Sequence, residues 1–203
     1  MQSNKVNQDF ILFPTIIPPK YLFDYSICYD PVILDQLYLA SQTILDEQMV
    51  KSLETQINND PKILNHVISS EFCNKVIDLN PTLATICILT SENTNQQLFC
   101  DELLKKATDI QIMEICLQVA KQNGFPSFFL QIYINQCIKH CESLHDPLAK
   151  DRIARMVCLF LLSLSKLQKI DLRDFSIECQ SFCLQYAKLK EAVTLYKLFK
   201  SFE

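Results

Sequence analysis

The residues of this chain that could do chemistry are, first, its ten cysteines. Cys137 and Cys141 lie four residues apart, as do Cys179 and Cys183, so each pair places two thiols one turn apart on one helix face. His145 extends the first pair to a row of three, and zinc prefers thiolate and imidazole ligands. Structural zinc sites usually take such ligands from a turn with CxxC spacing, which the sequence lacks. We therefore predict that these cysteines pack in a core and that the chain has no metal site.

The three histidines do not predict a nucleophilic site. Nucleophilic catalysis needs a base within reach of a nucleophile. His140 and Cys141 are adjacent in the sequence, so their side chains point to different helix faces. His66 falls in a short amphipathic segment and is expected at or near the surface. We predict no catalytic residue, and we predict that the chain is not an enzyme.

Two pairs of adjacent acids, Asp46–Glu47 and Asp101–Glu102, have the residue types of general acid and base catalysis. Neighbouring side chains on a helix diverge by about 100°, so neither pair converges on one substrate. We expect these four acids to cap helices or to lie on solvated faces.

A single glycine, Gly124, in 203 residues excludes several architectures. Dinucleotide-binding loops, phosphate-binding loops and nucleophile elbows all need glycine at fixed positions, and tight β-hairpins usually need it too. No cofactor is therefore expected. An all-helical protein remains, in which Gly124 is expected to supply the one left-handed or unusually tight bend.

Capping residues and helical periodicity divide the chain after residue 30. Four helix starts combine an Asp or Asn with a following proline, because the side-chain oxygen accepts from a free N–H and proline has none to leave unpaired. These four are Asp30, Asp60, Asn80 and Asp146, and further expected caps are Asp46, Ser70, Asp109 and Asp171. The expected helices cover residues 31–42, 46–58, 60–68, 70–79, 81–91, 95–106, 109–122, 126–144, 147–168, 171–186 and 188–202.

This pattern predicts an all-α fold: a single domain of about ten to eleven antiparallel packed helices over residues 31–203, an irregular bundle or solenoid with no clear sequence repeat. Residues 1–30 are interrupted by prolines and are expected to form an extended or partly disordered arm. The segment 153–164, including Leu159, is apolar on nearly every side and is expected to be the hub of the C-terminal half. Ile132 is expected on a buried stripe with Tyr133. The longest apolar run, 156–164, is too short to span a membrane.

The charge is unevenly distributed along the chain. Residues 1–147 carry 9 basic and 17 acidic side chains, whereas residues 148–203 carry 10 basic and 6 acidic. The three arginines, Arg152, Arg155 and Arg173, all lie in the second part, and arginine pairs well with carboxylates. We take them as candidate partner-binding residues, with Arg152 and Arg155 the first choice for a buried ion pair or a partner contact. A solvated face, an acidic protein partner and direct RNA contact are the alternatives for the basic segment, with RNA contact the least favoured.

Several segments in order resemble one family. Residues 132–142 are similar to the pattern YI-x-x-CI-x-x-CE, and residues 152–164 (RIARMVCLFLLSL) to R-x-x-R-x-VC-x-FL-x-SL. Residues 175–200 are similar to F-x-E-x-Q-x-FC followed by EA-x-x-L-x-x-L-x-K. Residues 59–68 and 79–89 are similar to DPKL-x-x-HI and NPL-A-x-x-x-L. Together these segments resemble subunit 11 of the Ccr–Not deadenylase complex, over roughly residues 20–202.

The resemblance implies the all-helical C-terminal domain of a non-catalytic subunit, in the cytoplasm and the nucleus. In that family the domain is a docking surface at the N-terminal end of the large Not scaffold, beside subunit 10, and the nucleases that shorten poly(A) tails are other subunits. Its expected partners are therefore the scaffold, subunit 10 and adaptor proteins, with no small-molecule substrate and no membrane. Family members usually carry a further N-terminal region that joins subunit 10 and the scaffold, and we expect this chain to lack it. The alternative function is a helical RNA-binding domain that uses a basic C-terminal face.

Overall fold

The structure, a computed structural model, describes residues 30–126, 128–170 and 176–201. The predicted arm lies outside these ranges except for Asp30, and so do Asp171 and Arg173. The described residues form eleven helices and no strand. The helices are α1 (Pro31–Ala40), α2 (Glu47–Asn59), η2 (Pro61–His66), α3 (Ser70–Leu79), α4 (Pro81–Thr90), α5 (Asn93–Lys105), α6 (Ile110–Lys121), α7 (Phe129–Ser143), α8 (Pro147–Lys166), α9 (Ser176–Gln185) and α10 (Lys190–Lys200).

The prediction of an all-α domain is confirmed, and most helix bounds differ from the expected ones by one to three residues. The segment expected as a helix over 60–68 is a 3-10 helix, η2. None of the helices in the described ranges is long and apolar enough to cross a membrane.

Aspartate before proline starts three helices as predicted. The carboxylates of Asp30, Asp60 and Asp146 accept from the main-chain N–H two residues further on, at 2.9, 3.2 and 3.1 Å. The predicted cap Ser70 is wrong by one position: the Ser69 hydroxyl accepts from Phe72 N–H at 3.2 Å instead. Serine at either position could have capped this helix, so the sequence did not distinguish them.

Asn80 precedes Pro81 at the start of α4, but its side chain does not cap the helix, so this prediction is wrong. Its Oδ1 accepts from Leu45 N–H at 2.8 Å, and its Nδ2 donates to the carbonyls of Ala40 and Thr43 at 2.7 and 2.8 Å. Ala40 is the last residue of α1, and Thr43 and Leu45 lie in the connection between α1 and α2. Asn80 is only 4% exposed, so it supplies partners to buried main-chain groups that water reaches poorly.

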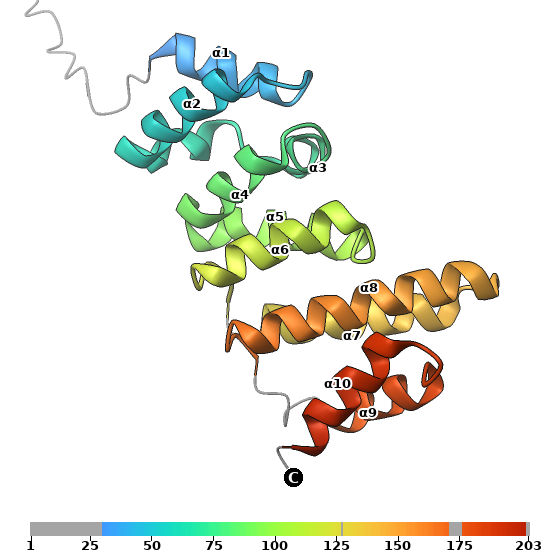
Figure 1. Ribbon diagram of the computed structural model, residues 1–203. Coiled ribbons are helices and arrows are strands. Elements are labelled where there is room, and N and C mark those ends of the chain that lie inside the picture. The colour runs from blue at the N-terminus through green and yellow to red at the C-terminus, as the bar shows by residue number, and fades with distance from the viewer. Residues whose placement is uncertain (1–29, 127, 171–175, 202–203) are drawn as a thin grey trace, which may run out of the picture.

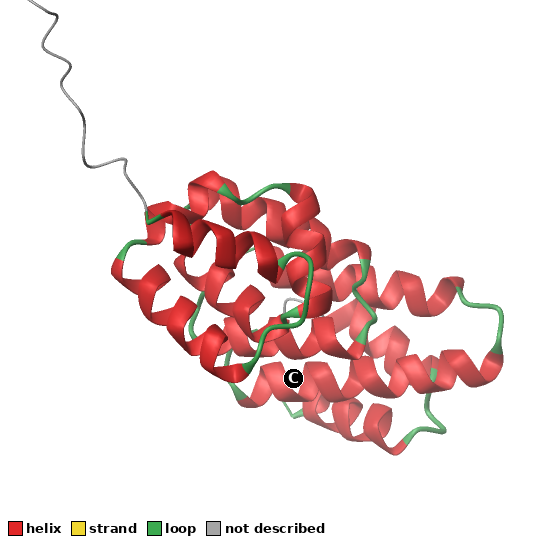
Figure 2. Ribbon diagram, turned by 90° about the horizontal axis from the view of Figure 1, so that it is seen from above, coloured by secondary structure: helices red, strands yellow, loops and turns green. Residues whose placement is uncertain are grey.

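The helices are stacked in two layers, which makes the fold a short solenoid (Figure 1). The even-numbered helices contact one another in succession, α2 with α4, α4 with α6, α6 with α8, and α8 with α10. The odd-numbered helices α1, α3, α5 and α7 do the same in the other layer. Within the stack α7 and α8 lie side by side and run antiparallel, and the connections between helices are short (Figures 1 and 2). The helix pairs differ in length along the stack, so the arrangement of paired helices repeats although the sequence has no repeat of fixed length.

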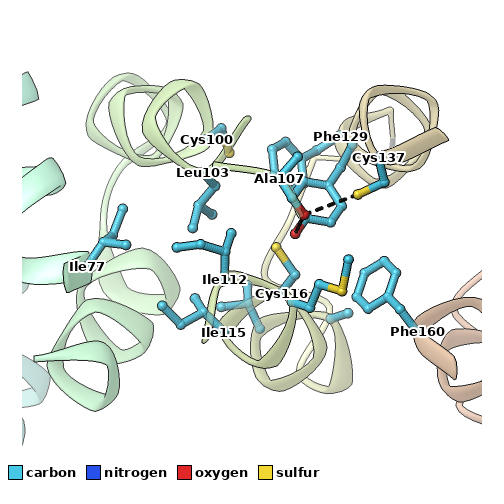
Figure 3. Close-up of a cluster of buried hydrophobic side chains, with 14 of the residues drawn as sticks. Ile77, Cys100, Leu103, Ala107, Ile112, Ile115, Cys116, Phe129, Cys137 and Phe160 are labelled. Carbon is cyan, nitrogen blue, oxygen red and sulfur yellow. Dashed lines mark hydrogen bonds between the residues drawn. The ribbon is translucent and has the colours of Figure 1, made fainter. Parts of the chain in front are cut away.

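Helix α8 is the hub of the C-terminal half, as predicted, since it contacts α6, α7 and α10. Its buried face, which includes Val157 and Phe160, packs against α7, where Tyr133 lies edge-on to the Phe160 ring. Tyr133 O–H donates to the Ala107 carbonyl at 2.6 Å. Cys137 Sγ donates to the same oxygen at 3.2 Å (Figure 3). These bonds tie the turn after α5 to α7 and satisfy buried polar groups at the centre of the stack.

The bend after α6 involves two residues with different roles. Asn123, and not Gly124, takes the left-handed conformation, with φ 56°. Gly124 has no positive φ, but a Cβ at this position would overlap the Leu89 and Val119 side chains. The prediction that Gly124 supplies the one left-handed bend is therefore wrong: Asn123 takes this conformation, which asparagine tolerates, and so does Gln168 after α8, with φ 53°. Glycine is required at position 124 because a Cβ has no room there.

Candidate docking surface

A groove runs between α6 and α8 on the even-numbered layer of the solenoid. Its volume is about 540 Å³, and its floor is mostly apolar: Met113 and Leu117 come from α6, and Met156, Leu159 and Phe160 come from α8. The two helices run parallel, as their matching ends show. The first residue of α6, Ile110, lies near the N-terminal half of α8, and the last residues of both helices, Lys121 and Lys166, line the same groove. Helices α6 and α8 contact each other near the core, and their solvent-facing sides are separated by a channel. We call this channel the α6–α8 groove.

Apolar side chains in and beside the α6–α8 groove are unusually exposed for their type. Leu159 is 49% exposed and Ile110 is 69% exposed. Both lie on the outer side of helices that have a complete buried face elsewhere. The hub prediction, which counted Leu159 among buried positions, is therefore wrong for this residue, because the even-numbered layer leaves one side of α8 uncovered. Exposed apolar side chains that line one hollow mark a site of interaction with another molecule.

One end of the α6–α8 groove is basic. Lys121 in the last turn of α6 and Lys166 in the last turn of α8 both line it. Lys121 Nζ bonds to the amide of Gln118 at 3.2 Å, and among the described residues neither lysine forms an ion pair. Lys169 lies just beyond, where its Nζ donates to Asn123 Oδ1 at 2.6 Å. Within the described ranges, this end therefore presents two lysines that no carboxylate pairs with.

The other end opens into a second hollow of about 520 Å³, where Arg152 lies. Ile110 and Met156 line both hollows, so the two are continuous. Arg152 is exposed, and the carboxylates of Asp109 and Asp146 line the same hollow, which makes this end mixed in charge. The structure thus places this predicted residue at the margin of the groove and not in a buried ion pair.

The other two predicted residues do not join Arg152. Arg155 is turned toward α10, where its Nε lies 3.5 Å from the Glu191 carboxylate, and this pair is partly exposed. The buried ion pair expected of Arg155 is therefore absent; the contact is a surface pair of small energetic effect. Arg173 lies outside the described residues.

The basic C-terminal segment is partly neutralised by the fold. Besides the pair that holds Arg155, Lys188 Nζ lies 2.7 Å from an Asp151 oxygen, which links α8 to the turn before α10. Acidic residues from α8 and α10 therefore use two of the ten cationic side chains, and Lys169 bonds an amide. No single basic face follows from the sequence excess alone.

A third hollow, of about 690 Å³, lies between α2, α4 and α6 and is polar. Polar side chains line most of it, among them Thr85, Gln111, Gln122, Glu54 and Glu114, and four apolar residues line the rest. Glu114 and Gln118 also line the α6–α8 groove, so the hollows follow one another along the even-numbered layer.

The nine cysteines in the described part of the chain are core residues, as predicted, and Cys28 lies outside the described residues. Cys137 and Cys141 are fully buried, and the Cys141 Sγ lies 3.3 Å from the Tyr186 hydroxyl, to which it donates. Burial raises the pKa of the Cys137 thiol to about 12, so it is protonated at neutral pH. His145 is exposed beyond the end of α7 and does not complete a row of ligands. Among the described residues no three Cys, His, Asp or Glu side chains are grouped as a metal site.

The acid pairs follow the prediction in three of four cases. Asp46 accepts from Met49 N–H at 2.7 Å and caps α2, Glu47 lies on the surface beside Lys51, and Asp101 is exposed. Glu102 contradicts the prediction, since it is 4% exposed. Its carboxylate accepts from Ser70 and, at 2.6 Å, from Lys105.

The histidines lie at the surface, as expected for His66, and His140 is also exposed.

Ile132, expected on a buried stripe, is 46% exposed on the outer side of α7. The sequence did not indicate the α6–α8 groove, because Leu159 was expected among the buried positions of the hub helix. The one available signal was an apolar surplus in α6 and α8 beyond what a single buried face requires.

Comparison with known proteins decides the family. The sequence model of a family described as CCR4-NOT transcription complex subunit 11 matches residues 77–200. The chain belongs to this family. The match runs from the end of α3 through α10, so it includes the α6–α8 groove. It also includes the whole of four of the five segments that carry the sequence resemblance; only residues 59–68 lie outside it.

A curated CCR4-NOT transcription complex subunit 11 from Dictyostelium discoideum is 25% identical to this chain over 187 residues. That alignment covers 90% of this chain and 29% of the relative. The chain thus spans less than a third of the length of the subunit 11 it matches, and it corresponds to one part of that protein.

Proposed function

We propose that this chain is a non-catalytic docking module of the CCR4-NOT complex, which makes protein contacts during the shortening of mRNA poly(A) tails. Membership of the subunit 11 family supports its place in the complex. The observation that carries the docking role is the α6–α8 groove, an exposed apolar channel inside the region that defines the family.

The partners we propose are the large Not scaffold, subunit 10 and adaptor proteins that reach the complex through this domain. The compartments we propose are the cytoplasm and the nucleus. A fluorescent fusion of the chain seen in both compartments supports this, and confinement to a membrane-bound organelle contradicts it.

The chemistry of the described side chains supports a role without catalysis. Burial raises the pKa of thiols such as Cys73 and Cys179 to about 12, which leaves them protonated and poorly nucleophilic. The described histidines lie at the surface, and the α6–α8 groove contains neither a histidine nor a cysteine. Its apolar floor suits the burial of a partner's side chains better than the stabilisation of charge in a transition state.

RNA binding by the C-terminal segment is the competing function. Ion pairs of Arg155 and Lys188 with acids of the same domain argue against it, because these cations are already partly neutralised. An RNA-binding face would also have to tolerate the acids that lie between the basic residues.

Affinity purification of the tagged chain from its own cells, followed by mass spectrometry, tests the proposal. We expect CCR4-NOT subunits, among them the large scaffold, in large excess over a tag-only control. Their absence contradicts the proposal. The purified chain is also expected to leave the tail of a synthetic polyadenylated RNA intact and to bind that RNA no better than a neutral protein at physiological salt. Tail shortening, or binding that falls steeply with salt, favours the competing functions.

A further inference from the structure

We propose that the α6–α8 groove receives an amphipathic helix of a partner protein, about three turns long, whose acidic first turn lies against Lys121 and Lys166. The inference rests on the proposed docking function and specifies the chemistry of the partner. Four features of the groove carry it: its apolar floor, its length, the charge at one end and the contrast with the other end.

The floor of the groove selects a helix over an extended peptide. An extended segment needs hydrogen-bond partners for its main chain, whereas a helix satisfies its own main chain internally. Five apolar side chains, Met113, Leu117, Met156, Leu159 and Phe160, offer no such partners along the floor. The polar side chains in the lining, Glu114, Gln118 and Ser163, are separate groups and not the continuous row of main-chain partners that an extended segment needs. The two methionines also adapt in shape to apolar side chains of different sizes. An apolar helix stripe with residues at i, i+3, i+4 and i+7 matches this surface.

The length of the groove sets the length of the ligand. Helix α6, whose first residue Ile110 and last residue Lys121 both line the groove, has 12 residues. At 1.5 Å per residue it is about 18 Å long, so a helix of about 12 residues laid beside it spans the groove from end to end.

The two lysines require negative charge in the ligand. Both helices end at Lys121 and Lys166, and among the described residues no carboxylate pairs with either side chain. A carboxylate from a partner would gain two cations at the edge of an apolar surface, where desolvation strengthens the attraction.

The orientation of the ligand follows from the difference between the two ends. Acidic side chains are most favourable in the first turn of a helix, where they also offset the positive end of its dipole. The opposite end of the groove combines Arg152 with Asp109 and Asp146, so it does not attract an anion as strongly. The bound helix therefore runs antiparallel to α6 and α8, with its N-terminus at the lysines.

The test is a display selection on the full 203-residue chain with a library of hydrocarbon-stapled twelve-residue helices, randomised at all other positions. We expect the enriched peptides to share an apolar i, i+3, i+4, i+7 stripe and Asp or Glu in the first turn. Dissociation constants of synthetic peptides from the enriched set are then measured by fluorescence polarisation on wild type and variants.

Leu159→Gln is expected to weaken these peptides about tenfold, as truncation of a central apolar contact does. Ile132→Gln is the matched control, because Ile132 is similarly exposed (46% against 49%) but lies on α7, and it should change affinity less than twofold. The double variant Lys121→Glu/Lys166→Glu should also weaken binding about tenfold. A peptide whose first-turn acids are replaced by lysine should recover affinity for that double variant.

The peptide experiments would overturn the proposal if they gave no enrichment above background, enriched peptides without the acidic first turn, equal binding to wild type and Leu159→Gln, or displacement of the peptide by an RNA 20-mer. Self-association of the chain that Leu159→Gln abolishes would also overturn it, since the occupant would then be a second copy. Recovery of CCR4-NOT subunits with the tagged chain is measured separately, so this proposal can fail while the proposed function stands.

Discussion

Replacement of Asn80 by alanine is expected to destabilise the N-terminal part of the solenoid strongly. The change removes the hydrogen bonds of Asn80 to Leu45 N–H and to the carbonyls of Ala40 and Thr43, and it leaves these main-chain groups without partners near a buried site. Each lost bond contributes about 1 kcal/mol, so the free energy of unfolding should fall by about 3 kcal/mol. With a urea m-value of about 2 kcal/mol/M, the midpoint should fall by about 1.5 M.

Urea titration followed by circular dichroism at 222 nm measures this change. Amide hydrogen exchange provides a local measurement, because the Leu45 N–H should lose protection from exchange when its acceptor, Asn80 Oδ1, is removed. Asn95→Ala is the matched control. Asn95 is half-buried, and its side chain donates to the exposed Asn65 side chain at 2.6 Å and not to a buried main-chain group, so its loss should change stability by less than about 0.5 kcal/mol. A loss below about 1 kcal/mol for Asn80→Ala, or equal losses for both variants, would refute the reasoning.

Three further predictions follow from buried positions. Gly124→Ala should lower the free energy of unfolding by about 1–3 kcal/mol in urea titration, because its Cβ would overlap Leu89, and a neutral effect would contradict that close approach. In a Cys28→Ser variant the other nine thiols, all buried, should resist alkylation by iodoacetamide for hours under native conditions and react at once in urea. Rapid alkylation under native conditions would contradict their burial. Burial raises the pKa of Glu102, but hydrogen bonds from Lys105 and Ser70 outweigh this effect, so its pKa in the folded protein lies below the ordinary value of 4.5. The ionised carboxylate therefore stabilises the fold above that pH. Glu102→Gln should therefore be less stable than wild type at pH 7, with a difference that narrows as the pH falls below about 4.5, and a constant difference from pH 7 to pH 3 would contradict this.

The helical architecture was predictable because local chemistry determines it. Asp30, Asp60 and Asp146 start helices through contacts only two residues long, and a stripe such as Tyr133, Cys137 and Cys141 is visible at helical spacing. Asn80 shows where this reasoning stops. Its position before Pro81 predicted a helix cap, but its side chain forms hydrogen bonds with main-chain groups 35 to 40 residues away in the sequence.

The candidate surface was harder to predict, because it depends on which helix faces remain uncovered. Leu159 and Ile132 both belong to apolar patterns, and both are about half exposed. Only the two-layer stack shows that Leu159 lines a groove between helices, whereas Ile132 lies on the outer side of α7. Glu102 is the reverse case: a charged residue is buried because Ser70 and Lys105, from α3 and α5, satisfy its carboxylate.

Site-specific photocross-linking in cells tests the docking account most directly. A photoreactive phenylalanine analogue placed at position 159, and in a separate chain at position 132, reports which molecules contact the α6–α8 groove and which contact the outer side of α7. The account predicts that position 159 cross-links to a protein that co-purifies with CCR4-NOT subunits, several-fold more strongly than position 132. Equal cross-linking at both positions, or cross-linking to RNA from position 159, would contradict it.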